Sequence, residues 1–133
     1  MPQAVTGLVV PWGVVGTVHG RRLRFAPGSL GPVSGGRLLV DHDNSQMVGR
    51  SVAAWSAPVG LWARFQLRPV SAVRVVALVR DGRRAGLSVG VDITEWVPDP
   101  EQAEVDLVLA ATWSETSLVA VPALAGARVT SCE

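Results

Sequence analysis

Residues 7–30, GLVVPWGVVGTVHGRRLRFAPGSL, carry the pattern that decides the fold class. Short apolar runs alternate there with turns rich in glycine and proline, at a spacing of roughly 8 to 12 residues for each strand and its turn. Small β-barrels and β-sandwiches show this spacing. The segment therefore predicts a β-rich fold.

Beyond this segment the apolar pattern continues to indicate strands. We expect them in 37–44, in two runs within 48–67 joined around Pro58 and Gly60, in 87–96, and in 104–121. The chain has 133 residues, 48% of them apolar, and shows no repeat or linker. We therefore expect one domain over residues 1–133 with a real hydrophobic core.

One segment departs from the strand pattern. Residues 69–82, PVSAVRVVALVRDG, place small and apolar side chains at helical spacing at positions 72, 76 and 79. Ser71 can act as the N-cap and Gly82 as the C-terminal stop. The pattern predicts a helix here, and hence a mainly β, α+β fold.

Charge and apolar patterning argue against two classes of partner. The formal net charge is +1, and the largest basic clusters are RRLR at 21–24 and DGRR at 81–84, too little for a nucleic-acid partner. The first basic residue is Arg21, and proline and glycine break the apolar opening before it reaches membrane-spanning length. We expect no signal peptide and no membrane partner, but a soluble, intracellular protein.

Cysteine and histidine are scarce. The only cysteine, Cys132, allows no internal disulfide and no cysteine-rich zinc site. The only histidines, His19 and His42, argue against a histidine-rich metal site, and His19 beside Gly20 fits a turn. We predict no metal and no cofactor.

His42 is the first candidate for chemistry. If RLLVDHDN at 37–44 is a strand throughout, His42 shares a face with Val40, and the neighbouring aspartates point the other way. Those aspartates would then be poorly placed to orient the imidazole. The simplest interpretation is a histidine that caps the end of a strand.

Ser88 is the second candidate. Alternation in LSVGVDI, residues 87–93, places four aliphatic side chains on one face and Ser88, Gly90 and Asp92 on the other. A serine with little bulk around it suits a nucleophile, because a peptide carbonyl must come close to its Oγ. The alternative is an ordinary serine that faces solvent on a glycine-rich strand.

Glu115 is the third candidate. In EVDLVLAATWSETSLVAV, residues 104–121, the face shared by Val105, Leu107, Leu109, Ala111 and Trp113 continues to Glu115 and Ser117. A carboxylate at the end of such a row is partly buried and needs a partner. An imidazole would make it the third member of a Ser-His-acid set, and one of the arginines would make it a structural ion pair.

Four motifs in order, between about residues 23 and 129, resemble the prohead protease family of tailed phages, relatives of the herpesvirus assemblins. They are RFAPGSL (24–30), LLVDHDNSQMVG (38–49), VVALVRDGRRAGLSVGVDI (75–93) and ETSLVAVPALAGARV (115–129). The third contains the Gly-x-Ser-x-Gly-like strand of the family and the fourth its Glu-x-Ser-Leu-Val-x-x-Pro-Ala pattern. The resemblance implies a small closed β-barrel with flanking helices.

The resemblance also implies an activity. It implies a serine peptidase with Ser88 as nucleophile, His42 as general base and Glu115 as a catalytic or structural acid. Its substrates would be scaffold protein and the N-terminal part of the major capsid protein, cut in the host cytoplasm inside the assembling prohead. It leaves room for a homo-oligomer.

Three other interpretations stay open. One is a catalytically inactive capsid-assembly module on the same fold. Another is an unrelated β-barrel binding domain, which predicts that Ser88 and His42 lie far apart. The last is a metallohydrolase built on histidine and carboxylate ligands.

Overall fold

The structure is a computed structural model that describes residues 3–31 and 36–133. This part of the chain forms nine strands and one α-helix, preceded by a 3-10 turn. The elements are β1 (Ala4–Pro11), β2 (Gly16–Val18), β3 (Arg21–Phe25), β4 (Arg37–Val40), β5 (Asp43–Ser56), β6 (Gly60–Leu67), η1 (Pro69–Ser71), α1 (Ala72–Arg80), β7 (Gly86–Pro98), β8 (Asp106–Val119) and β9 (Arg128–Cys132).

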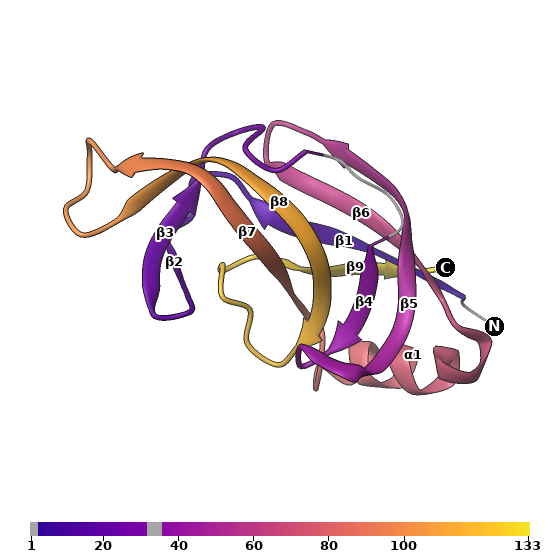
Figure 1. The fold of residues 1–133 in the computed structure, drawn as a ribbon. Helices are drawn as coiled ribbons and strands as arrows, with labels where there is room; N and C mark the ends of the chain where they lie inside the picture. The colour runs from indigo at the N-terminus through magenta and orange to yellow at the C-terminus, as the bar shows by residue number, and fades with distance from the viewer. Residues whose placement is uncertain (1–2, 32–35) are drawn as a thin grey trace.

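The sheet closes into a barrel through β8. The strand order is β2-β3-β8-β4-β5-β6-β1-β9-β7, and β7 also pairs with β8, so that the seven strands from β8 round to β7 form a closed ring. β3 and β4 both run parallel to β8, β3 beside its beginning and β4 beside its end. Figure 1 shows the long β7–β8 hairpin reaching beyond the barrel with β2 and β3 beneath it. The expected mainly β, closed barrel is confirmed.

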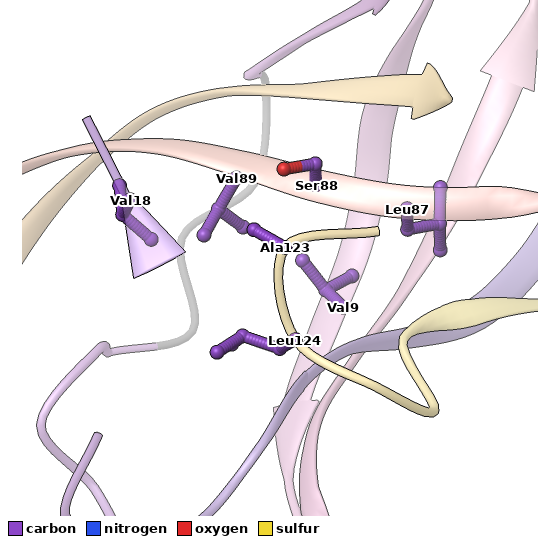
Figure 2. Close-up of a pocket in the computed structure, with 7 residues that line it drawn as sticks. All are labelled: Val9, Val18, Leu87, Ser88, Val89, Ala123 and Leu124. Atoms are coloured by element: carbon purple, nitrogen blue, oxygen red, sulfur yellow. The ribbon is translucent and has the colours of Figure 1, made fainter. Parts of the chain in front are cut away.

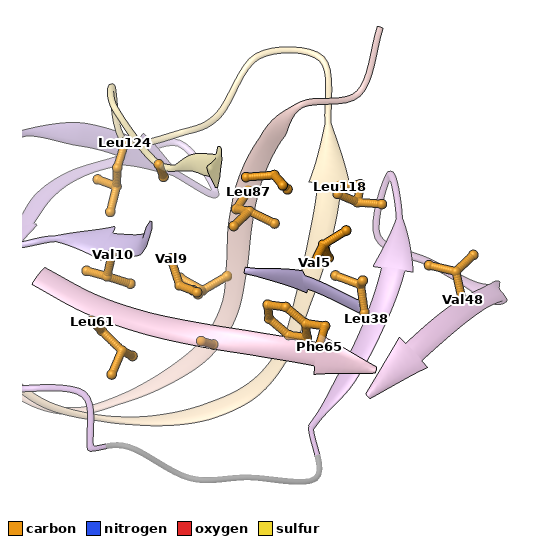
Figure 3. Close-up of a cluster of buried hydrophobic side chains, with 14 of the residues drawn as sticks. Val5, Val9, Val10, Leu38, Val48, Leu61, Phe65, Leu87, Leu118 and Leu124 are labelled. Atoms are coloured by element: carbon orange, nitrogen blue, oxygen red, sulfur yellow. The ribbon is translucent and has the colours of Figure 1, made fainter. Parts of the chain in front are cut away.

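The barrel interior is filled by aliphatic and phenylalanine side chains. Figure 3 shows part of this cluster, with Val5, Leu38 and Leu118 on the same side of Phe65. Because alternate residues of a strand face inward, each short apolar run of the sequence contributes side chains to the barrel core. No helix in the described residues is long and apolar enough to cross a membrane.

Helix α1 packs one face against this core. Its buried residues are Ala72, Val75 and Val76. Ser71 occupies the N-cap position without a side-chain capping hydrogen bond. The predicted stop is confirmed, because Gly82 takes a positive φ of 78° and donates its N–H to a helix carbonyl.

The predicted strand 37–44 is wrong at its end. β4 stops at Val40, which pairs with Asp43 at the start of β5, and Asp41 and His42 form the two-residue turn between them. Both turn residues have positive φ, 53° and 57°. Two-residue hairpins favour this geometry because its twist matches that of the flanking strands. His42 therefore does not share a strand face with Val40.

The predicted inward face of 104–121 is not continuous: Val105 is buried as expected, but the face breaks further along the strand. Leu109 is 38% exposed, whereas Val108 is fully buried. The pairing of β8 with β7 shifts register between Glu95 and Trp96, where Leu109 has no partner, and between Gly90 and Val91, where Ser114 has none. Each shift changes which residues of β8 face the core.

Candidate active site

His42 is held in its turn by contacts from two other elements. Its backbone N–H donates to Ser117 Oγ of β8 at 2.9 Å. Its neighbour Asp41 donates a backbone N–H to the Leu118 carbonyl and accepts a forked hydrogen bond from the Arg84 guanidinium, at 3.0 and 3.1 Å. A left-handed conformation costs a non-glycine residue roughly 1 to 3 kcal/mol, so these contacts offset a real strain. These contacts fix the backbone position from which the His42 side chain extends.

The imidazole pairs with Glu115. His42 Nδ1 lies 2.6 Å from Glu115 Oε1, and the two side chains are 46% and 12% exposed. A carboxylate can only accept hydrogen bonds, so Nδ1 carries a proton, and in the neutral form of the imidazole the lone pair is then on Nε2. Of the two partners that the sequence left open for Glu115, the structure gives it the imidazole.

Gly90 makes room for this pair. It lies opposite Glu115 in the β7–β8 ladder. A Cβ at position 90 would lie 3.0 Å from Glu115 Cγ and Cδ, and closer still to Oε1. The missing side chain, which we expected to clear a path for substrate beside Ser88, thus leaves the space that the carboxylate occupies.

Ser88 lies on β7, half-buried, with the predicted alternation confirmed around it. Leu87 and Val89 are buried in the core on either side of it. Figure 2 shows the Ser88 hydroxyl directed away from Leu87, Val9 and Leu124. Ser88 pairs with Ser117 across the ladder, where Cβ atoms lie about 4.5 to 5.5 Å apart. Since Ser117 also binds the His42 backbone, the three candidate residues meet at one place.

Ser88, His42 and Glu115 all line one open groove of about 350 Å³. Its remaining lining residues are Thr17, Val18, His19, Val89, Gly90 and Ala123. The apolar cavity on the other side of Ser88, drawn in Figure 2, holds only about 10 Å³, room for about one water molecule. A substrate that reaches Ser88 must therefore lie in the open groove.

The groove also contains residues that the sequence did not single out for chemistry. His19 lies in the β2–β3 turn with Gly20, as expected, at positive φ values of 51° and 76°, yet it also lines the groove. Gly90 also lines the groove and Ser117 is buried beside it, and in the sequence both are only neighbours of the candidates. The i, i+2 spacing of Glu115 and Ser117 was the one signal that placed a second polar group beside the acid.

The described part of the chain contains no group of three or more histidine, cysteine, aspartate or glutamate side chains that could hold a metal ion.

The architecture is similar to that of herpesvirus proteases. Kaposi's sarcoma herpesvirus protease in complex with a hexapeptide phosphonate inhibitor aligns with a TM-score of 0.63 at 16% identity, over 97% of this chain and 64% of that chain. The same viral protease in complex with an allosteric inhibitor aligns with a TM-score of 0.61 at 15% identity, over 98% of this chain and 77% of that one. The chain thus spans less than two thirds of the first of these proteases, and at such identities the likeness establishes the fold. The predicted assemblin-like barrel is confirmed.

The sequence itself carries the family assignment. No curated protein sequence matches the chain. The model of the caudovirus prohead serine protease family matches residues 3–133. This excludes an unrelated β-barrel binding domain: the chain belongs to the caudovirus prohead serine protease family, a family of serine peptidases.

Proposed function

We propose that this chain is an endopeptidase of capsid maturation in which Ser88 is the nucleophile, His42 the general base and Glu115 the acid that orients it. The observation that carries the proposal is the 2.6 Å contact between His42 Nδ1 and Glu115 Oε1 in the groove that Ser88 also lines. A histidine paired with a carboxylate beside a half-exposed serine is the arrangement that nucleophilic catalysis requires.

The first half of the reaction forms an acyl-enzyme. His42 Nε2 takes the proton of Ser88 Oγ as this oxygen attacks the scissile carbonyl carbon, and the carbonyl oxygen becomes an oxyanion. The imidazolium is stabilised by the Glu115 carboxylate. As the C–N bond breaks, Nε2 gives its proton to the leaving amine, and the acyl group remains on Ser88 as an ester.

The second half regenerates the enzyme. Water gives a proton to His42 Nε2 while its oxygen attacks the ester carbon. The ester C–O bond breaks, the proton returns to Ser88 Oγ, and the acid product leaves. Glu115 keeps its charge throughout, since it holds the tautomer and does not take the proton.

The shape of the groove supports a polypeptide substrate. A second cavity of about 230 Å³, lined in part by Val91, Asp92 and Ile93 of β7, shares Val18 and His19 with the groove beside Ser88. From Ser88 to Ile93 a strand spans about 16 Å at 3.3 Å per residue, the length of about five extended substrate residues. β2, which supplies Val18, ends the strand order and can offer backbone groups to an added strand.

The family assignment supports a substrate in the prohead. We propose that the chain cuts scaffold protein and the N-terminal part of the major capsid protein within the assembling particle. Confinement there would raise the local substrate concentration and restrict cleavage to assembly.

Co-expression with the capsid and scaffold proteins of the same phage or prophage tests the proposal. The wild type is expected to shorten at least one of them, with new termini identified by mass spectrometry, and Ser88→Ala and His42→Ala are expected to leave both intact. Processing that persists in Ser88→Ala would instead support an inactive assembly module on the same fold.

A further inference from the structure

Ser117 is a buried hydroxyl to which neither the family pattern nor the proposed mechanism gives a task. It is fully buried in β8, with 0% exposure. Its Oγ lies 3.1 Å from Glu115 Oε2 and 2.9 Å from the His42 backbone N. Both partners belong to the proposed acid–base pair, and the residue across the ladder is Ser88.

The protons in this cluster can be assigned by elimination. The His42 N–H can only donate, so Ser117 Oγ accepts that bond with a lone pair. The single Ser117 hydroxyl proton is then free for Glu115 Oε2, which can only accept. Glu115 therefore receives one hydrogen bond on each oxygen, from Ser117 on Oε2 and from His42 Nδ1 on Oε1.

We propose that Ser117 is a positioning residue that locks the Glu115 carboxylate and the His42 turn into one rigid unit; this rests on the proposed function. With its Oε2 held, the carboxylate cannot rotate away from the imidazole. With its backbone N–H held, the strained turn cannot move His42 out of the groove. Ser117 touches no substrate, because it is buried beneath the groove that the other residues line.

A hydroxyl in this position differs from an ordinary satisfied core serine. Thr116, the next residue, is also 0% exposed, and its Oγ1 accepts a hydrogen bond from the Trp113 indole at 2.9 Å. Thr116 thus makes a hydrogen bond of similar burial to a residue outside the pair, although the same indole N–H also donates to the Glu115 backbone carbonyl at 3.2 Å. It provides a matched control on the same strand.

The experiment measures how fast a fluorophosphonate probe labels the full chain. In labelling, Ser88 Oγ attacks phosphorus, fluoride leaves and His42 takes the proton, so the rate reports the acid–base pair and needs no known peptide sequence. Ser117→Ala is expected to slow labelling by about 10- to 100-fold, the effect typical of removing a hydrogen bond to a charged group. Thr116→Val is expected to label at nearly the wild-type rate.

A double-mutant cycle separates positioning from general packing. If Ser117 acts through Glu115, Ser117→Ala slows labelling less in the Glu115→Ala background than in the wild type, because only its hydrogen bond with the His42 backbone N–H is then left to lose. Two losses that simply multiply would overturn the proposal. If Ser117→Ala does not fold, Ser117→Cys replaces it, because a thiol keeps the shape but is a weak donor.

Proton NMR gives a readout that a merely structural hydroxyl would not move. The resonance of the His42 Nδ1 proton is expected to shift in Ser117→Ala and to stay in place in Thr116→Val. Unchanged resonance and unchanged labelling in folded Ser117→Ala would overturn the proposal. A wild type that reacts at no serine would instead overturn the proposed function, while the NMR comparison would still decide whether Ser117 positions the pair.

Discussion

The two ends of the β7–β8 ladder each hold a carboxylate, and the partners of these carboxylates differ. Near Ser88, Glu115 accepts a hydrogen bond from His42, an imidazole half exposed to the groove. Past the far end of β7, Asp99 is bound by Arg24 of β3 through Nε at 2.5 Å and Nη2 at 3.1 Å. An imidazole can lose and regain a proton near neutral pH, and a guanidinium cannot.

The far end is built as a clamp. Arg21 of β3 pairs with Asp106 at 2.5 Å and stacks on Trp96, 4.5 Å from the ring centroid. With Arg24 and Asp99 it fastens β3 to the hairpin that reaches beyond the barrel in Figure 1. A buried carboxylate alone therefore does not identify a catalytic site. The distinguishing feature is a partner that can exchange a proton.

Ser88→Ala should cause the largest loss of activity at the end of the ladder that holds Ser88, His42 and Glu115. Without Oγ no acyl-enzyme forms, so kcat for peptide cleavage should fall by roughly 10⁶-fold. The melting temperature should stay near that of the wild type. Ser56→Ala, an exposed serine of β5, is the control and should cleave normally; equal loss in both variants would contradict the role of Ser88.

Removing one charge at each end sharpens the comparison. Glu115→Gln leaves His42 without a carboxylate to fix its tautomer, so kcat should fall by about 10³- to 10⁴-fold. Asp99→Asn weakens the pairing with Arg24 and should lower the melting temperature while cleavage is kept. Measurements of kcat and of the melting temperature on the same two variants check this. A large fall in kcat in Asp99→Asn would contradict the assignment of catalysis to the Glu115 end and of stability to the Asp99 end.

Gly90→Ala should disturb the functional end indirectly. The added methyl collides with Glu115 and pushes the carboxylate off the imidazole, so we expect a loss of about 10- to 100-fold in kcat, comparable to loss of a charged hydrogen bond. The control for the collision is Gly20→Ala. This variant adds a methyl group where there is open space, although the positive φ of Gly20 means that the alanine strains the turn. A Gly90→Ala variant with full activity would show that the carboxylate position is not critical.

Acid should slightly lower the stability that the Asp99–Arg24 pair gives to the far end of the β7–β8 hairpin. The hydrogen bond from Arg24, with a backbone N–H from Glu101, holds the pKa of Asp99 below its usual 3.8. A lowered folded-state pKa stabilises the fold above pH 3.8, and this stabilisation is lost as pH falls through the folded value. Unfolding followed between pH 5 and about pH 2 should show a smaller decline in Asp99→Asn than in the wild type; equal declines would contradict the assignment.

The fold could be predicted from sequence because its information is local. The spacing of short apolar runs gave the strands, and Gly82 marked the end of the helix that begins after Ser71. Ser88 was placed correctly because β7 keeps strict alternation from Leu87 to Gly90, before its first bulge.

The rest depends on contacts that alternation does not encode. Asp41 and His42 adopt a left-handed turn whose second position, where His42 stands, is usually glycine, and distant groups, Arg84 and Ser117, offset its strain. The inward face of β8 was missed because a bulge depends on how two strands meet.

The partner of Glu115 also required three dimensions. His42 lies 73 positions away and reaches it because β4 runs parallel to β8 with Val40 opposite Leu118, which places the turn after β4 beside Ser117. The family resemblance groups His42, Ser88 and Glu115 only through the order of the motifs along the chain. The structure shows the contact between His42 and Glu115.

The most direct test of the Ser88, His42 and Glu115 unit is peptide mapping by mass spectrometry after reaction with the fluorophosphonate probe. The adduct is expected on Ser88 alone, and it should be lost in folded His42→Ala and retained in Asp99→Asn. An adduct on another serine, or equal labelling of Ser88 in His42→Ala, would contradict the assignment of this end of the ladder as the catalytic one.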